Sequence, residues 1–245
     1  MIPLRDHNPT RRTPLVTWAL IGACIAAFAL ELSITATGGN VALERFFLRW
    51  AAIPSEITAA LEAGDYAGQA VVGIFSSMFL HGGWLHLLGN MLYLWIFGNN
   101  IEDRLGHVPF LLFYLAAGVA AVLAQVAIGP DSDIPLVGAS GAIAGALGAY
   151  LVLFPGARIL SLVFLGFFYQ LLEVPALIVL GFWFALQLLN GVAGLGAQTA
   201  EGGVAFFAHI GGFVFGLVVG FVLRLVGGGA RPRGPSYGYP YSSMG

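Results

Sequence analysis

The sequence places a serine between glycines, in Gly138-Ala139-Ser140-Gly141, where a polar loop becomes an apolar run of membrane length. A neutral serine is a poor nucleophile until an imidazole removes its proton. His209, in the first turns of the last apolar run, is the candidate for that imidazole. We therefore expect acyl transfer by nucleophilic catalysis, with Ser140 as the nucleophile and His209 as the general base and acid.

Acyl transfer also needs hydrogen-bond donors for the oxyanion that develops on the attacked carbonyl. His86 and Asn90 lie at positions i and i+4 of another apolar run, so they share one helix face. We expect their side-chain N–H groups and the Ser140 backbone N–H to form an oxyanion hole. These three runs hold no carboxylate, which favours a Ser-His dyad, although Asp133 and Glu201 are near enough in sequence to leave a triad open.

The composition is that of an integral membrane protein. Of 245 residues, 58% are hydrophobic and only 9% are charged, whereas a soluble domain carries about a quarter charged residues. The single cysteine, Cys24, excludes a disulfide within the chain and disfavours a cysteine metal site. We expect no metal and no cofactor. The ten arginines are too scattered for a nucleic-acid footprint, so we expect no nucleic-acid partner.

The apolar runs predict an all-α, polytopic membrane bundle over residues 14–226. Its six transmembrane helices are expected at about 15–34, 83–99, 107–128, 137–154, 175–190 and 204–226. Residues 1–13 form a polar N-terminal segment, and the apolar stretch 159–172 follows a break and is expected at the membrane interface. The Gly-, Pro-, Ser- and Tyr-rich residues 227–245 are expected to be a disordered tail.

Arginine placement predicts the orientation. With six helices, both termini and most arginines fall on one side, namely Arg5, Arg11, Arg12, Arg104, Arg158, Arg224, Arg231 and Arg233. The positive-inside rule makes that side cytoplasmic. The second, fourth and sixth helices then enter from outside, and each carries its polar residues near that entry. We therefore expect these polar side chains to meet in one cavity that opens to the outside.

Two glycine pairs are spaced for close helix packing. Gly141 and Gly145 lie on one face of the fourth helix, and Gly212 and Gly216 lie on one face of the sixth. Such small-residue faces let two membrane helices approach closely. Packing of these faces would bring Ser140 and His209 together.

Several other residues have open interpretations. His81 stands at the mouth of the second helix, where capping and function are equally supported. Phe182, Trp183 and Phe184 are expected to face lipid or to pack a gate rather than to form a cofactor site, and the role of Gln187 is undecided.

Together these motifs resemble the rhomboid family of intramembrane serine proteases. Residues 81–90 (HGGWLHLLGN) are similar to its second-helix motif, 138–141 (GASG) to its nucleophile motif, and 208–216 (AHIGGFVFG) to its last-helix histidine motif. The resemblance covers about residues 70–226, with the motifs in family order. It implies a six-helix core, the Ser140–His209 dyad, an oxyanion hole from His86, Asn90 and the Ser140 amide, and cleavage of transmembrane proteins near the outer surface. It also implies that the fifth helix and the loop after it, 190–203, act as a gate.

Two positions depart from the family pattern. Many members carry an aromatic residue under the histidine ring, four positions after the nucleophile, where this chain has Ala144. Support for the ring must therefore come from elsewhere. The first loop lacks a clear Trp-Arg pair, because Arg49-Trp50 is in the reverse order.

Two other functions compete with a peptidase. A non-catalytic relative that binds membrane clients would be expected to have lost Ser140 or His209, and both are present. A proton-coupled transporter would carry polar residues across the whole membrane, whereas here they cluster at one end. We expect transmembrane protein substrates, the lipid bilayer as surroundings, and a bacterial cytoplasmic membrane as the location. The substrate and the oligomeric state stay open.

Overall fold

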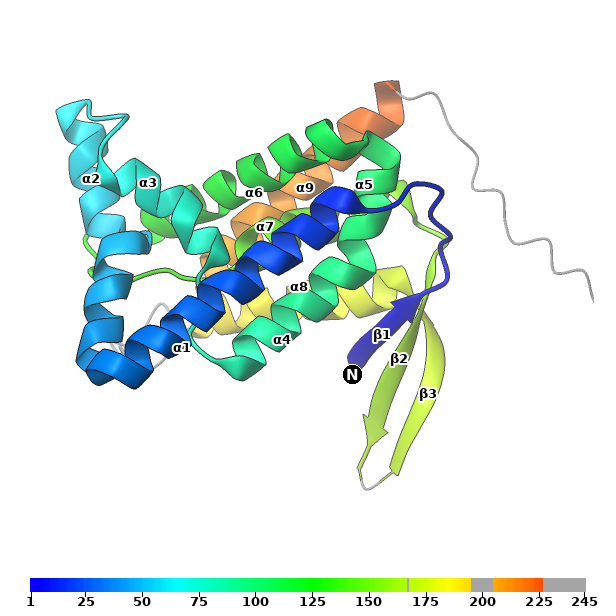
Figure 1. The fold of residues 1–245 in the computed structure, drawn as a ribbon. Helices are drawn as coiled ribbons and strands as arrows, with labels where there is room; N and C mark the ends of the chain where they lie inside the picture. Colours follow the sequence, from blue (N-terminus) through cyan, green and yellow to red (C-terminus); the bar gives the residue numbers. More distant parts are fainter. Residues whose placement is uncertain (167, 195–204, 227–245) are drawn as a thin grey trace, which may run out of the picture.

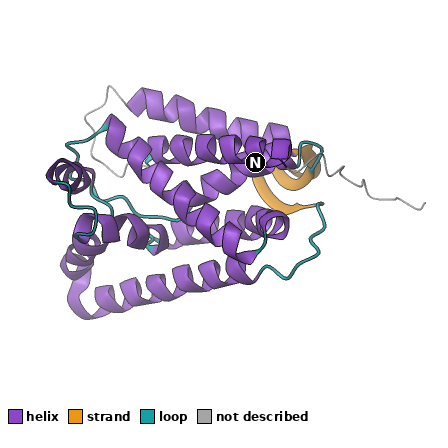
Figure 2. Cartoon of the chain, turned by 90° about the horizontal axis from the view of Figure 1, so that it is seen from above, coloured by secondary structure: helices purple, strands orange, loops and turns teal. Residues whose placement is uncertain are grey.

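The computed structural model describes residues 1–166, 168–194 and 205–226; the expected tail at 227–245 lies outside them. Its helices pack into one bundle (Figure 1), and the strands gather at one end of that bundle (Figure 2). In the described part, the helices long and apolar enough to cross a membrane alone are α1 (Leu15–Trp50), α6 (His107–Ile128), α8 (Ala176–Gly194) and α9 (Phe206–Val226). The prediction of a helical, multi-pass membrane protein is confirmed.

A bent pair of helical segments is long and apolar enough to cross a membrane only when its two parts are taken together. Its first part joins α3 (Gln69–Ser76) to η1 (Ser77–Phe79), and its second part, bent from the first by 80°, covers 84–105. The second part consists of α4 (Trp84–Tyr93), the π-helical turn η2 (Leu94–Gly98) and α5 (Asn99–Leu105). The helix expected at 83–99 therefore continues further than predicted. Its polar end stays helical because Asn100 and Glu102 are buried with hydrogen-bond partners.

The central helix α7 (Ser140–Leu153) is shorter than a membrane span. Its 14 residues rise about 21 Å at 1.5 Å each, against about 30 Å of hydrocarbon. All residues from Gly141 to Tyr150 are buried, because α6 and α9 pack along this helix. The helix expected at 137–154 thus begins later, at the half-buried Ser140.

The first helix extends beyond the expected range of 15–34. It continues to Trp50 with a break at Gly39, whose φ of 69° is open to glycine. The connection then forms α2 (Pro54–Ala63) before α3 begins. The helices expected at 175–190 and 204–226 are observed as α8 and α9 with slightly different ends, and residue 204 lies outside the described part.

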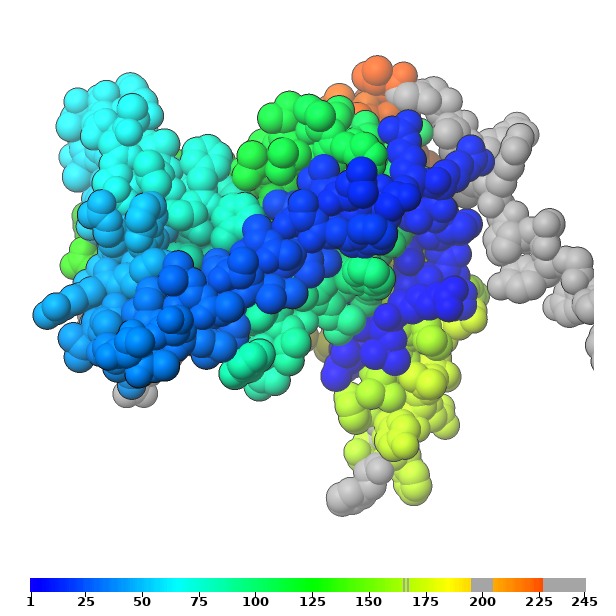
Figure 3. Space-filling view, viewed as in Figure 1, coloured from blue at the N-terminus to red at the C-terminus, as the bar shows by residue number. Residues whose placement is uncertain are grey.

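A small antiparallel sheet was not foreseen by the prediction of helices alone. Strands β1 (Ile2–Asp6), β2 (Arg158–Leu165) and β3 (Phe168–Pro175) pair in the order β1-β2-β3. The polar N-terminal segment therefore supplies a strand, and the stretch expected at the interface is a hairpin. This hairpin projects from the body of the molecule (Figure 3). The sequence of β2 does not show the alternation of polar and apolar residues that is typical of a strand, because nearly every position is apolar.

Asp6 joins the sheet to the bundle. Its Oδ2 accepts hydrogen bonds from the Tyr150 hydroxyl at 2.8 Å and from Asn100 Nδ2 at 2.7 Å. Burial raises the pKa of the Asp6 carboxyl above its ordinary value, and this outweighs the opposite effect of the two hydrogen bonds. The contact fixes the end of α7 that lies away from Ser140.

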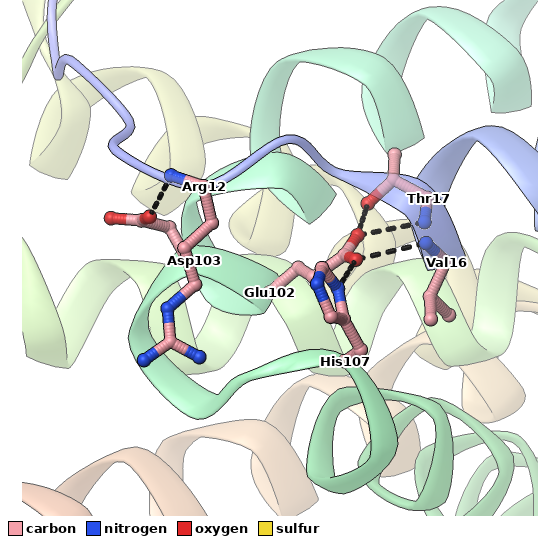
Figure 4. Close-up of polar contacts among 6 residues, drawn as sticks. All are labelled: Arg12, Val16, Thr17, Glu102, Asp103 and His107. Atoms are coloured by element: carbon pink, nitrogen blue, oxygen red, sulfur yellow. Dashed lines mark hydrogen bonds and ion pairs between the residues drawn. The ribbon is translucent and has the colours of Figure 1, made fainter.

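Glu102 holds the start of α1 against α5. Its two carboxylate oxygens accept from the backbone N–H groups of Val16 and Thr17, each at 2.8 Å, and from the Thr17 hydroxyl at 2.7 Å (Figure 4). His107 Nδ1 lies 2.6 Å from the same carboxylate. A carboxylate at a helix N-terminus satisfies free N–H groups and complements the helix dipole. Glu102 therefore caps the N-terminus of α1.

Candidate active site

Ser140 is delivered to the interior by the loop that precedes α7. This loop pairs with the chain near the end of α1, since Leu136 N donates to Ala52 O at 2.8 Å and Ala52 N donates to Leu136 O at 3.2 Å. Two residues before the serine, Gly138 adopts a φ of 129°, and its N–H donates to Ser77 O at 2.9 Å. Only glycine adopts this backbone readily, so the loop can turn sharply into α7.

The serine meets the predicted histidine. Ser140 Oγ lies 2.7 Å from His209 Nε2, although the two residues are 69 positions apart. His209 stands in the first turn of α9 and is only 9% exposed. The hydroxyl and the imidazole therefore have the geometry of a nucleophile and its base.

Glycines set the spacing of α7 and α9. A Cβ placed on Gly212 would overlap the carbonyl oxygen of Gly141, and one on Gly216 would overlap that of Gly145. The two backbones are therefore in direct contact through the two predicted glycine faces. Because Gly141 follows Ser140 and Gly212 lies one turn after His209, this contact holds the serine and the histidine at hydrogen-bonding distance.

The opposite side of the His209 ring faces α8. Its Nδ1 lies 2.7 Å from Gln187 Oε1, and the Trp183 ring lies 5.8 Å away at an interplanar angle of 37°. Ring support thus comes from α8, and the departure at Ala144 is compensated there. Trp183 and Gln187 are spaced i and i+4 in an apolar run, and this spacing is the sequence signal that could have identified both.

Gln187, whose role the sequence leaves undecided, links the helix expected to form the gate to His209. Phe182 is 54% exposed and faces away from the core, whereas Phe184 stacks on Phe213 at 4.5 Å. Most of the loop expected to move with the helix, 195–203, lies outside the described residues.

His86 lies beside the nucleophile. A Cβ on Gly138 would lie 2.6 Å from His86 Nε2 and 3.5 Å from Ser140 Oγ, so the ring edge occupies the space that glycine leaves free. The Gly82 N–H points to His86 Nδ1 at 3.4 Å. An acceptor at Nδ1 leaves the proton on Nε2, which directs an N–H donor toward the serine.

Asn90 lies one turn after His86 on α4 and is buried. Its side chain is 8% exposed, and its Nδ2 has no hydrogen-bond partner among the residues that the structure describes. A buried amide N–H without a partner costs about 1–3 kcal/mol. This amide N–H is therefore available to a further acceptor.

His81 is buried at the turn that precedes α4. Its backbone N–H donates to Glu31 Oε1 at 3.0 Å, and its ring Nδ1 bonds to Phe79 O at 3.0 Å. The ring packs against His86 with centroids 5.2 Å apart. His81 therefore orients the turn that leads into α4.

The carboxylates considered for a triad do not contact His209 within the described part of the chain. Asp133 Oδ1 accepts from the Ser55 hydroxyl at 2.6 Å in the exposed loop. Glu201 lies outside the described residues. Both ring nitrogens of His209 are already engaged, one by Ser140 and the other by Gln187.

An apolar pocket opens next to the nucleophile. It holds about 370 Å³ of empty space, part of it open to solvent. Ser140 contributes to its wall, and the remaining wall is mostly small and aliphatic, including Met78, Gly118, Val122 and Leu136. The wall beside the serine hydroxyl is therefore uncharged.

Comparison with known protein families gives a match over the part of the chain that holds the site. The family model described as Rhomboid domain matches residues 68–226, a span that includes all four polar residues of the site. This chain belongs to the rhomboid family. Its rhomboid domain accordingly begins at the start of the bent helical pair and ends with α9.

Individual rhomboid relatives come from distant organisms. The chain is 33% identical to Rhomboid protein 1, mitochondrial, of Saccharomyces cerevisiae, over 65% of this chain and 43% of the relative. It is 33% identical to RHOMBOID-like protein 4 of Arabidopsis thaliana, over 83% and 46% respectively. It is 34% identical to Rhomboid protease GluP of Bacillus subtilis, over 64% and 27%. In each of these matches the chain spans less than half of the relative's length.

Proposed function

We propose that this chain is a serine endopeptidase that hydrolyses peptide bonds of transmembrane proteins. The observation that carries the proposal is the 2.7 Å separation of Ser140 Oγ and His209 Nε2. His209 Nε2 takes the hydroxyl proton while Oγ bonds to the substrate carbonyl carbon. The same nitrogen then gives its proton to the leaving amine, and the C–N bond breaks. Water then attacks the acyl-serine while His209 Nε2 takes its proton. The same nitrogen returns the proton to Ser140 Oγ as the second product leaves.

The proposed oxyanion hole consists of Asn90 Nδ2, His86 Nε2 and the Ser140 backbone N–H. The unpaired buried amide of Asn90 and the direction of the His86 ring support this role. Donors fixed in place before the reaction need no reorganisation when charge develops on the carbonyl oxygen.

The short central helix supports a substrate within the membrane. Because α7 is shorter than the hydrocarbon layer, we place Ser140 below the membrane surface when α1, α6, α8 and α9 span it. A bond that reaches this serine belongs to a segment in or near the bilayer. We assign the end of the bundle that carries the sheet to the cytoplasm. Most of the described arginines lie in or next to the elements at that end, namely Arg5, Arg12, Arg104, Arg158 and Arg224.

The proposal is tested with purified protein in lipid vesicles and a fluorescent model transmembrane substrate. Wild-type protein should cleave it, and Ser140→Ala and His209→Ala should abolish cleavage without lowering the melting temperature by more than a few degrees. Ser161→Ala, a buried serine in β2, is the matched control and should retain activity. Cleavage by purified Ser140→Ala at the wild-type rate would refute the proposal.

A further inference from the structure

We propose that Gln187 is a positioning residue, which fixes the tautomer of His209 and makes the base competent only while α8 lies against α9. The inference rests on the proposed peptidase chemistry of Ser140 and His209. Its first support is the 2.7 Å contact between Gln187 Oε1 and His209 Nδ1. Gln187 is also the one polar side chain among residues 176–189.

The contact decides where the proton of neutral His209 resides. An amide oxygen can only accept, so the imidazole must carry its hydrogen on Nδ1. Nε2 is then left as the lone-pair nitrogen that faces the Ser140 hydroxyl, which is the tautomer that a general base needs. The opposite tautomer would direct an N–H at the serine and block proton transfer.

A neutral orienting group suits this location. The amide oxygen of Gln187 accepts from Nδ1–H both before and after His209 takes the serine proton, so the bond persists through the reaction. A carboxylate would hold the same tautomer, but a charge within the membrane is costly. No described carboxylate is bonded to the His209 ring, which makes Gln187 the group that performs this role.

Both supports of the histidine come from a single helix. Trp183 and Gln187 lie on one face of α8, and the ring and the amide contact His209 together. The other face of α8 exposes apolar side chains such as Leu177, Phe182 and Leu189. Movement of α8 away from α9 would remove the ring contact and the hydrogen bond at once. Closure of α8 on a bound substrate would therefore complete the base.

The test compares two substitutions at this position in vesicles. Gln187→Met keeps the length of the side chain and removes the acceptor. We expect kcat to fall roughly 10- to 100-fold, as when the hydrogen-bond partner of a metal-bound histidine is removed. KM should change little. Gln187→Glu keeps an acceptor and adds a negative charge that favours the protonated ring. Its activity should recover at high pH, and the acid side of its pH profile should move to higher pH than in the wild type.

Gln170→Glu, at an exposed position on β3, adds the same charge away from the ring and should leave the profile unchanged. If Gln187→Met does not fold, the profile of Gln187→Glu decides alone. Wild-type kcat in Gln187→Met, or an unshifted acid limb in Gln187→Glu, would overturn the inference. Either result would leave the proposed function intact as long as Ser140→Ala is inactive, whereas an active Ser140→Ala would remove the proposed function itself.

Discussion

The carbonyl oxygen of Gly141 occupies the space where a Cβ on Gly212 would lie. This contact joins the residue after the nucleophile to the residue one helical turn after the base. The close packing of α7 and α9 therefore holds Ser140 Oγ and His209 Nε2 at 2.7 Å from each other.

Gly212→Ala should separate α7 from α9. The added methyl would meet a backbone oxygen that cannot move without its helix, and a misplacement of about 1 Å at a reacting centre can cost about 100-fold in rate. We expect a cleavage rate lowered by about that factor, together with a lower melting temperature. Gly181→Ala on α8, where the added Cβ has no neighbour within 4 Å, is the control. Equal rates and equal melting temperatures in the two variants would contradict the packing argument.

Asn90→Ala should slow the chemical step more than it weakens substrate binding. Oxyanion donors act mainly in the transition state, and removal of one typically costs about 10²–10³ in kcat. The same measurement on His86→Ala should give a similar direction. Leu88→Ala, at an exposed position of the same helix, should keep wild-type kcat. A higher KM with unchanged kcat in Asn90→Ala would assign that residue to binding instead.

Phe182 and Trp183 are expected to differ although they are neighbours. Trp183 packs on His209, and an aromatic contact is worth about 0.5–1.5 kcal/mol, so Trp183→Ala should lower the rate about 2- to 10-fold. Phe182 is exposed on α8, and Phe182→Ala should retain or raise cleavage of transmembrane substrates by loosening the gate. Steady-state rates in vesicles distinguish the two. A gain of activity in Trp183→Ala would mean that gate packing outweighs support of the ring.

Asp6 should make stability depend on pH. Its pKa is raised in the folded protein by burial, so between its ordinary value and the raised one the folded state binds more protons than the unfolded state. The free energy of unfolding therefore falls as pH rises through that window. Asp6→Asn keeps an acceptor for Tyr150 and Asn100 but does not titrate. As pH rises through the window, the melting temperature of the wild type should therefore fall relative to that of the variant.

Two further variants bracket the Asp6 contact. Asp6→Ala leaves the Tyr150 hydroxyl and Asn100 without their acceptor, which should cost about 1–3 kcal/mol of stability. Asp131→Asn, at an exposed loop position, should show wild-type behaviour. A constant difference between wild type and Asp6→Asn at every pH would show that Asp6 is not the titrating group.

The residues of the candidate site could be selected from the sequence because polar residues are rare in apolar runs. Ser140, His86, Asn90 and His209 stand out for that reason, and the glycine spacing indicates which helices approach each other. Gln187 has the same signature, but its role depends on which face of α8 meets α9. The spacing of residues in one sequence does not tell how α8 is rotated relative to α9.

The parts of the fold that escaped prediction depend on long-range contacts. β1 and β2 are separated by most of the chain, and no local pattern indicates that Asp6 will pair beside Ile159. The helical extension over α5 was not predicted, because the partners of its polar residues on α1 are distant in sequence. The short length of α7 also follows from burial among its neighbours, since its apolar run alone extends further.

The most direct test of the Ser140–His209 dyad is labelling of the purified protein with a fluorophosphonate, followed by peptide mass spectrometry. The reagent bonds to a serine oxygen only when a base activates it. We predict modification of Ser140 in the wild type, and its loss in both Ser140→Ala and His209→Ala when each remains folded. Wild-type protein that stays unlabelled at Ser140, or His209→Ala that is labelled there at the wild-type rate, would contradict the account.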